Sequence, residues 1–304
     1  MISLRTSAIQ RVVLAAGCAA ALALAVPAMG AEPAQKVFAT PEAAMTAFGE
    51  AVANQDEAAM KVLLGSNFRE LIPPVGDELR TRFLDAWAKG HTIEPTGATT
   101  AHIAVGTDGW TMPIPLEKTD KGWHFDTLAG VDEITFRRVG RNELSVIQTM
   151  MAVVDAQREY ASTTHDGVPV LVYASKLESS PGKHDGLYWP SQAGEPPSPL
   201  GPAFLQAHAQ AAGSAGYHGY RYKLLTGQGS HAPGGAYDYL VNGKLFGGFG
   251  VMAWPVRYQD TGVKSFIVNH DGVVYERDLG PKSAERAAGT KLFDPGTGWK
   301  KVSP

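Results

Sequence analysis

Two acidic side chains are the first candidates for chemistry in this sequence. Glu159 lies near the end of an apolar-periodic segment, and Asp185 follows in a loop over residues 181–202 that is rich in proline, glycine and serine. Two carboxylates can act as general acid and general base when one cleft separates their pKa values. Glu159 and Asp185 are therefore the candidate catalytic residues of a hydrolase.

The same loop and the segments after it are dense in aromatic residues. Tyr and Trp suit recognition of a sugar, a peptide or a protein, because they combine a large contact area with a polar group. Strands also use aromatic residues for core packing, so both interpretations stay open. The candidate binding residues are Lys183, Asp185, Tyr188, Trp189, Tyr239 and Trp254.

Several catalytic signatures are absent from the sequence. It has no Gly-x-Ser-x-Gly elbow, no His-Glu-x-x-His helix, no P-loop and no dinucleotide fingerprint. His165, His184 and His270 each precede Asp-Gly, which is typical of turns, and no histidine pair has the helical spacing of zinc ligands. Asp166 alone is too little for a calcium loop. We expect no metal and no cofactor, and the pattern favours a non-catalytic protein.

The N-terminus has the pattern of a secretory signal peptide. Arg5 and Arg11 precede an apolar run, and small residues offer a cleavage site near Gly30 or Ala31. The apolar run is about 15 residues long, whereas a membrane-spanning helix needs about 20. The sequence thus predicts cleavage of residues 1–30, a periplasmic or secreted protein, and no transmembrane segment in the mature chain.

Cys18, the only cysteine, lies inside this N-terminal segment. Leu14–Cys18 has the form of a lipoprotein cleavage box, so anchoring through a lipid on Cys18 is the alternative. If the segment is removed, the mature chain has no thiol, which excludes disulfides and cysteine metal sites.

The charge of the chain bears on its partners. Loss of the two N-terminal arginines changes the formal net charge from −3 to −5. A mildly acidic chain without a basic run argues against nucleic acid and anionic membranes. The expected partner is an envelope protein or a glycan.

Hydrophobic periodicity divides the chain into two predicted domains. In residues 36–139, three helices open at Thr40, Asp56 and Glu78, and strands follow at 101–105, 110–116 and 122–126. This order predicts an α+β domain with a curled antiparallel sheet, analogous to nuclear-transport-factor-2-like domains.

The second predicted domain covers residues 140–304. It opens with a helix over Arg138–Ser162, capped by Asn142, and the boundary falls near Gly140. The expected core face of this helix is formed by Leu144, Ile147, Met151, Val154 and Ala161. A short helix at 203–212 follows the loop.

An antiparallel β-meander over 216–280 completes the second domain. Asn242-Gly243 and His270-Asp271-Gly272 mark its hairpin turns, because these residues accept a positive φ. The helix and meander have a faint likeness to the globular domains of type IV pilins and pseudopilins.

Five segments carry a family resemblance that covers nearly the whole mature chain. They are Arg137–Leu144, Asp155–Ala161, Pro181–Pro190, Ala232–Tyr239 and Val263–Glu276. These motifs resemble the bacterial domain-of-unknown-function 2950 family. The resemblance implies an exported protein of Gram-negative bacteria, and it implies no activity, cofactor or catalytic residue. Relatives have a more acidic turn where Thr164–Val168 stands, which further weakens a calcium site.

Three functions remain open from the sequence. The first is a non-catalytic binding or accessory protein of the cell envelope, with the loop at 181–202 and its neighbouring aromatics as the contact surface. The second is a hydrolase of an envelope polymer that uses Glu159 and Asp185. The third is a structural, pilin-like assembly component. An apolar face left uncovered on the long helix would favour this function.

Overall fold

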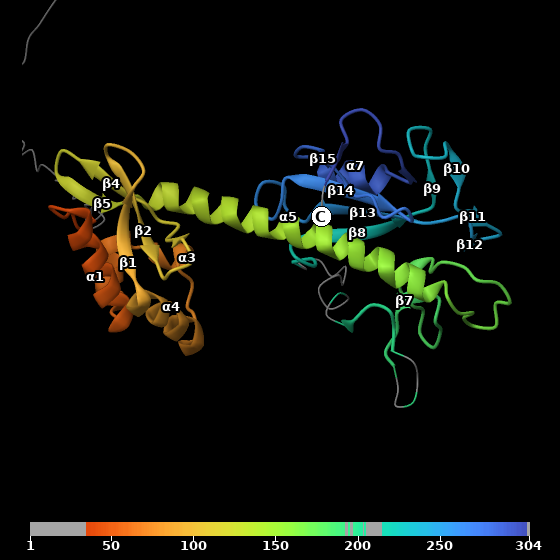
Figure 1. The fold of residues 1–304 in the computed structure, drawn as a ribbon, viewed down its shortest axis with the longest axis horizontal. Coiled ribbons are helices and arrows are strands. Elements are labelled where there is room, and N and C mark those ends of the chain that lie inside the picture. Colours follow the sequence, from red (N-terminus) through yellow and green to blue (C-terminus); the bar gives the residue numbers. More distant parts are fainter. Residues whose placement is uncertain (1–34, 192–193, 195–196, 203, 205–214, 303–304) are drawn as a thin grey trace, which may run out of the picture.

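The computed structural model describes residues 35–302 except 192–193, 195–196, 203 and 205–214. The predicted signal peptide, Cys18 and most of the predicted helix at 203–212 lie outside the described residues. Two groups of elements lie toward the two ends of one long helix, α5 (Thr127–Tyr160), as Figure 1 shows. Helices combined with mainly antiparallel sheets confirm the predicted α+β class.

The elements before α5 form a helical layer on a sheet. The helices are α1 (Pro41–Ala53), α2 (Glu57–Leu64), α3 (Phe68–Leu71) and α4 (Asp77–Lys89). The strands are β1 (His91–Pro95), β2 (Thr100–Val105), β3 (Trp110–Thr111), β4 (Leu116–Thr119) and β5 (Gly122–Phe125). The sheet has the antiparallel order β1-β2-β4-β5, with β3 paired to β2.

Local signals in the sequence explain these elements. Thr40 and Asp56 accept hydrogen bonds from backbone N–H groups three residues ahead, at 3.2 and 2.9 Å, so both are N-caps, at the two residues where the first two predicted helices open. The predicted strand at 110–116 is divided into β3 and β4. Pro113 and Pro115 stand between them, and proline cannot donate to a strand ladder.

A first hydrophobic core joins the helices to the sheet. Its fully buried side chains come from α1, α2, α3 and three of the strands: Ala44, Phe48, Leu63, Leu64, Phe68, Ile103, Leu116 and Phe125. This core is separate from the buried cluster of the C-terminal half.

Helix α5 begins eleven residues before the predicted start at Arg138. Asp126 is its N-cap and accepts a hydrogen bond from the Ala129 N–H at 3.0 Å. The predicted cap, Asn142, lies inside the helix and donates from its amide to the Thr261 carbonyl at 2.9 Å. The boundary predicted near Gly140 falls in the middle of α5.

The core face of α5 differs from the predicted one. Ile147 and Val154 are buried as expected, whereas Leu144 is 68% exposed. Met151 and Ala161 are only half-buried. The buried stripe also includes Val146, Met150, Val153 and Gln157.

The elements after α5 are mostly short strands. Those of the loop region are β6 (Lys176–Glu178) and β7 (Gly186–Tyr188), which pair in parallel. The main sheet contains β8 (Tyr220–Leu225), β13 (Gly250–Pro255), β14 (Lys264–Asn269), β15 (Tyr275–Asp278) and β17 (Lys300–Lys301). The remaining elements are β9 (Gly227–Gln228), β10 (Tyr237–Asp238), β11 (Leu240–Val241), β12 (Lys244–Leu245), α7 (Ser283–Gly289) and β16 (Leu292–Phe293).

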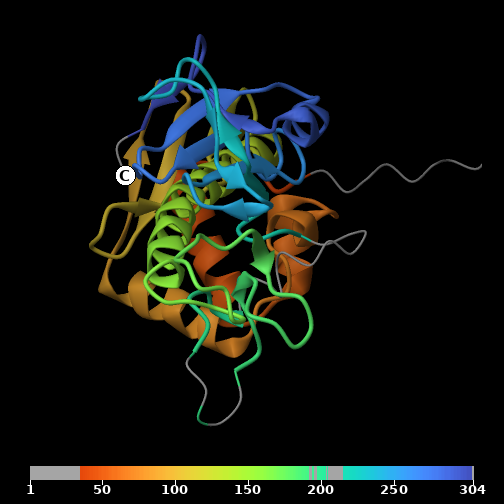
Figure 2. The same cartoon turned by 90° about the vertical axis from the view of Figure 1, so that its right-hand side faces the viewer.

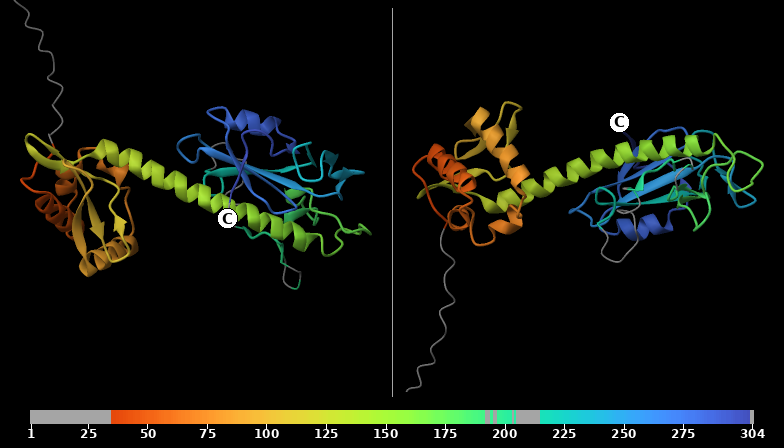
Figure 3. Two further views of the ribbon diagram at one scale, coloured as in Figure 1. Left: turned by 45° about the horizontal axis from the view of Figure 1, so that its top comes forward. Right: turned by 90° about the horizontal axis from the view of Figure 1, so that it is seen from below.

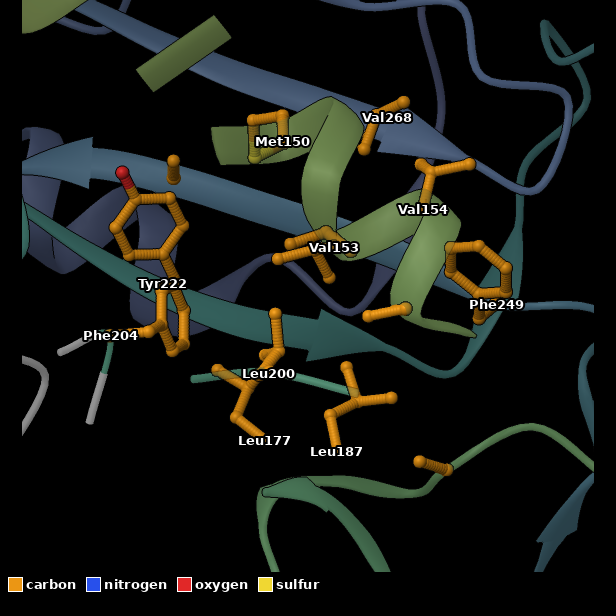
Figure 4. Close-up of a cluster of buried hydrophobic side chains, with 14 of the residues drawn as sticks. Met150, Val153, Val154, Leu177, Leu187, Leu200, Phe204, Tyr222, Phe249 and Val268 are labelled. Carbon is orange, nitrogen blue, oxygen red and sulfur yellow. The ribbon is translucent and has the colours of Figure 1, made fainter. Parts of the chain in front are cut away.

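The main sheet has the order β17-β15-β14-β13-β8 and is antiparallel throughout. Helix α5 covers one face and α7 the other (Figures 1 and 2). Strand β13 alternates accordingly: Val251 and Ala253 join the α5 core, and Met252 joins the cluster that contains Ala287 of α7. Figure 4 shows Met150, Val153 and Val154 of α5 in the first of these clusters.

Both predicted turns of the meander are confirmed. Val241 pairs with Lys244 across Asn242-Gly243, whose φ values are 50° and 76°, so the two residues form a two-residue hairpin turn between β11 and β12. The turn at His270–Gly272 joins β14 to antiparallel β15. The segment after residue 280 contains α7, a helix that was not predicted from the sequence.

In the part of the chain that the structure describes, no helix is both long and apolar enough to span a membrane.

Candidate functional site

Asp185 has a network of donors around its carboxylate. It accepts hydrogen bonds from Lys176 Nζ at 2.7 Å, from the Ser180 N–H at 2.7 Å and from the Ser180 hydroxyl at 3.0 Å. Partial burial acts to raise the pKa of Asp185, but these three bonds and the Lys176 charge outweigh it and lower the pKa to about 2. The carboxylate is therefore ionised at neutral pH, and its contacts close the turn between β6 and β7.

Glu159, the other candidate catalytic residue, is exposed near the end of α5. Within the described residues no hydrogen bond joins its side chain to Asp185. Between them, the Tyr160 hydroxyl donates to the His184 carbonyl at 2.5 Å, and the His184 N–H donates to the Asp166 carboxylate at 2.9 and 3.1 Å. This end of α5 thus anchors two loops, and it does not pair the two carboxylates as an acid and a base.

Tyr160 at this anchor is unsuited to act as a base near neutral pH. Burial, with the nearby negative charges of Asp166 and Asp185, raises the pKa of its hydroxyl to about 12. His165 stacks on the Tyr160 ring with centroids 3.9 Å apart. These contacts are those of a packed loop anchor.

The six candidate binding residues do not form one surface. Trp189 and Tyr239 are 5% and 0% exposed, so their rings pack in the core and offer no face to a ligand. Tyr188 packs against the α5 side of the main sheet, and Trp254 packs against the α7 side. Lys183 is exposed at the tip of the turn, and Asp185 is half-buried beneath it.

The histidines do not build a metal centre in the described residues, where no group of three His, Cys, Asp or Glu side chains is placed to hold an ion. His231 Nδ1 lies 3.0 Å from Asp294, whose carboxylate also accepts the His231 N–H at 2.9 Å. That carboxylate joins two loops beside β9 and β16.

A cavity of about 480 Å³ lies in the N-terminal half, where sequence reasoning placed no site. It is open to solvent on one side and is bounded by α1–α4, by β3 and the segment that follows it, and by Ile134 of α5. Its apolar lining includes Phe48, Val52, Met60, Phe68, Leu71, Ile72, Val75, Leu79, Phe83, Trp110, Met112, Ile114 and Ile134. The size is within the usual range of about 300–1,000 Å³ for small-molecule sites.

The polar groups of the cavity are arranged as two ion pairs. Arg69 pairs with Glu57, and Arg80 lies 3.4 Å from Asp77. The fifth polar lining residue is Gln55. Because each arginine is neutralised by its own carboxylate, the site has no excess charge for an ionic ligand.

Several apolar lining residues remain accessible. Leu79, Val75 and Trp110 are 54%, 48% and 46% exposed, whereas Phe48 and Phe68 behind them are buried. Phe48 contacts Phe83 edge-to-face with centroids 6.2 Å apart, and Phe83 contacts Trp110 at 6.5 Å. These rings form a continuous apolar wall from the core to the surface.

The sequence did contain one signal for this cavity. Val75 follows two prolines, and Leu79 lies at the start of α4. Both are apolar, although neither belongs to a predicted core face. What periodicity could not show is that α4, β3 and α5 come together around them.

The fold and the cavity together define a class: a mixed α+β protein whose two halves have separate hydrophobic cores and are joined by one long helix, with an apolar cavity beside the core of the N-terminal half. The family of proteins of unknown function DUF2950 matches residues 35–302, so the chain belongs to this family, as its motifs indicated. No curated protein and no solved structure matches the chain. The likenesses to nuclear-transport-factor-2-like domains and to pilins therefore gain no support from a related structure.

Proposed function

We propose that this protein is an exported, non-catalytic binding protein that holds an uncharged apolar molecule in the cavity of its N-terminal half. The observation that carries the proposal is the cavity itself, about 480 Å³ in volume and lined mainly by apolar side chains. The signal-peptide pattern before residue 31 supports export.

The composition of the lining supports binding over catalysis. Its residues include no Ser, Thr, Cys, Tyr, Lys or His, so the only candidate nucleophiles in the lining are two carboxylates. Both carboxylates, Glu57 and Asp77, are paired with arginines at the edge of the site. The hydrolase alternative depends on Glu159 and Asp185, neither of which lines this cavity.

A neutral fluorescent probe tests the proposal. N-phenylnaphthylamine brightens in apolar surroundings, and we expect the full chain to bind about one equivalent of it. Leu79→Glu places a charge on the accessible wall and should weaken binding at least about tenfold, because a bound apolar molecule would remove that charge from water without a partner. Leu79 is half-exposed, so the variant should fold.

Leu128→Glu is the matched control. Leu128 is 81% exposed on α5 and does not line the cavity, so this variant should bind the probe as the unmodified chain does. Absence of probe binding to the folded protein, or equal loss in both variants, would remove the basis for the proposal.

A further inference from the structure

Gln55 lies at the mouth of the apolar cavity, between α1 and α2. The cavity belongs to the N-terminal group of elements, which both views of Figure 3 show at one end of α5. Among the lining residues that the structure describes, Gln55 alone carries a side-chain amide. The residue is exposed and yet lines the cavity, so its amide lies where the cavity meets solvent.

The turn between α1 and α2 disfavours the glutamine that stands in it. Gln55 follows Asn54, the C-cap of α1, and has a φ of +53°. Its N–H donates to the Val52 carbonyl at 3.3 Å, and the next N–H, that of Asp56, donates to the Ala51 carbonyl at 2.9 Å. This pattern ends a helix with a left-handed residue, for which glycine is usual because a side chain is strained there. The contribution of Gln55 therefore comes from its side chain.

Arg80 of α4 orients the Gln55 amide. The amide oxygen accepts hydrogen bonds from Nη2, Nε and Nη1 of Arg80 at 2.8, 3.0 and 3.3 Å. A guanidinium has donors and no acceptor, so the oxygen is the amide atom that faces it. Within the described residues, no hydrogen bond uses the two N–H groups on the other branch of the amide. These two donors are available to water or to a ligand at the mouth of the cavity.

We propose that the cavity takes an apolar molecule with one uncharged hydrogen-bond acceptor, such as a ketone or ester carbonyl, and that the Gln55 N–H groups bind this acceptor. The inference rests on the proposed function and adds the chemical class of its ligand. The apolar body lies against the wall that contains Phe68 and Phe83, and the acceptor lies at the mouth. A few polar groups that fix the orientation of a ligand in a mainly apolar site are the usual arrangement.

The ion pairs of the lining favour an uncharged acceptor over a carboxylate. Arg80 contacts Asp77 as well as the Gln55 oxygen. Arg69 is paired with Glu57. A bound carboxylate would be a third negative charge in a lining that has two arginines and two carboxylates, and like charges at close range repel. An amide N–H binds a neutral acceptor without this imbalance.

Two naphthalenes of similar outline separate the acceptor from the apolar body. 2-Acetylnaphthalene has a carbonyl where 2-ethylnaphthalene has a CH₂ group, and both are measured on the full chain by displacement of N-phenylnaphthylamine. Gln55→Glu keeps the side-chain length and an acceptor for Arg80, but it removes the N–H donors. We expect this variant to weaken binding of 2-acetylnaphthalene at least about fivefold more than binding of 2-ethylnaphthalene, because the carbonyl loses its partner.

Asn54→Asp is the matched control variant. It adds the same negative charge one residue earlier, at an exposed side chain that does not line the cavity. The ratio of the two naphthalene affinities should equal that of the unmodified chain. A ratio that changes as much in Asn54→Asp as in Gln55→Glu would show a general effect of charge and would overturn the role of the Gln55 amide.

The remaining outcomes separate this inference from the proposed function. If Gln55→Glu weakens both naphthalenes by the same factor, the amide binds no acceptor and the inference is wrong, although the cavity still binds apolar molecules. 2-Naphthoate has a similar outline with a negative charge, and tighter binding of it than of 2-acetylnaphthalene to the unmodified chain would overturn the uncharged class. Failure of N-phenylnaphthylamine itself to bind would overturn the proposed function and this inference with it.

Discussion

Replacing Asp185 with asparagine tests whether this carboxylate serves the fold. In the structure it receives three hydrogen bonds, two from Ser180 and one from Lys176, and so closes the turn between β6 and β7. Asparagine keeps the size of the side chain but removes the charge that attracts Lys176. We expect Asp185→Asn to lower the stability of the C-terminal half.

The magnitude follows from the change in pKa. A fall from 3.8 to about 2 corresponds to about 2.5 kcal/mol, at about 1.4 kcal/mol per pKa unit. The side chains of Asp185 and Lys176 are 28% and 48% exposed, so solvent screens their interaction. A loss of about 1–1.5 kcal/mol is therefore expected, equivalent to about 2–5 °C in melting temperature.

The effect has a defined dependence on pH. Because the pKa of Asp185 is lower in the folded chain than in the unfolded chain, its contribution is complete above the unfolded value of 3.8. It is lost as the pH falls from there toward about 2. The difference between Asp185→Asn and the unmodified chain should accordingly be largest near neutral pH and shrink below about pH 4.

Calorimetry at about pH 7 and about pH 3 measures this difference. Asp155→Asn is the control, since the Asp155 side chain is 72% exposed and pairs with Arg158 on the helix surface at 3.3 Å. Its effect should stay within about 0.5 kcal/mol. If Asp185→Asn costs no more than the control, or if its cost is independent of pH, the structural role is refuted and Asp185 returns as a catalytic candidate.

Two further substitutions test the packing around α5 and the first sheet. Gln157→Met should cost about 2–4 kcal/mol in thermal unfolding, because the buried amide makes bonds of 2.8 and 3.0 Å to the Ala174 backbone, whereas Gln148→Met at an exposed position should be nearly neutral. Gly122→Ala should cost about 1–3 kcal/mol in chemical denaturation, because φ is +127° and a Cβ would lie 2.4 Å from the Phe38 carbonyl oxygen. A neutral Gly122→Ala would show that the backbone shifts freely there.

The elements with local signals were the predictable ones. The Thr40 cap and the Asn242-Gly243 turn are interactions between residues close in sequence, and the structure has both. The first residue of α5 was harder to predict from the sequence. Asp126 is also a good cap, but glycines at 130 and 140 weaken the helical pattern before Arg138, and packing against the N-terminal half overrides that weakness.

The candidate sites show the same limit. The density of aromatic residues made Trp189 and Tyr239 candidate binding residues. A binding surface and a hydrophobic core can have the same density of aromatic residues, so the sequence does not distinguish them. Only the burial of the two rings separates these uses. Likewise, the sequence could name Glu159 and Asp185, whereas only the structure shows that Lys176 and Ser180 hold the Asp185 carboxylate.

The sequence by itself determined the family, the α+β class, most of the elements and the export pattern, because each depends on local motifs or on periodicity. Tertiary structure alone decided that α4, β3 and α5 border an apolar cavity, and that α5 buries opposite faces at its two ends. One helix has one periodicity, but which side of each turn is covered depends on what packs against it. That is why Leu144, predicted as core, is exposed to solvent.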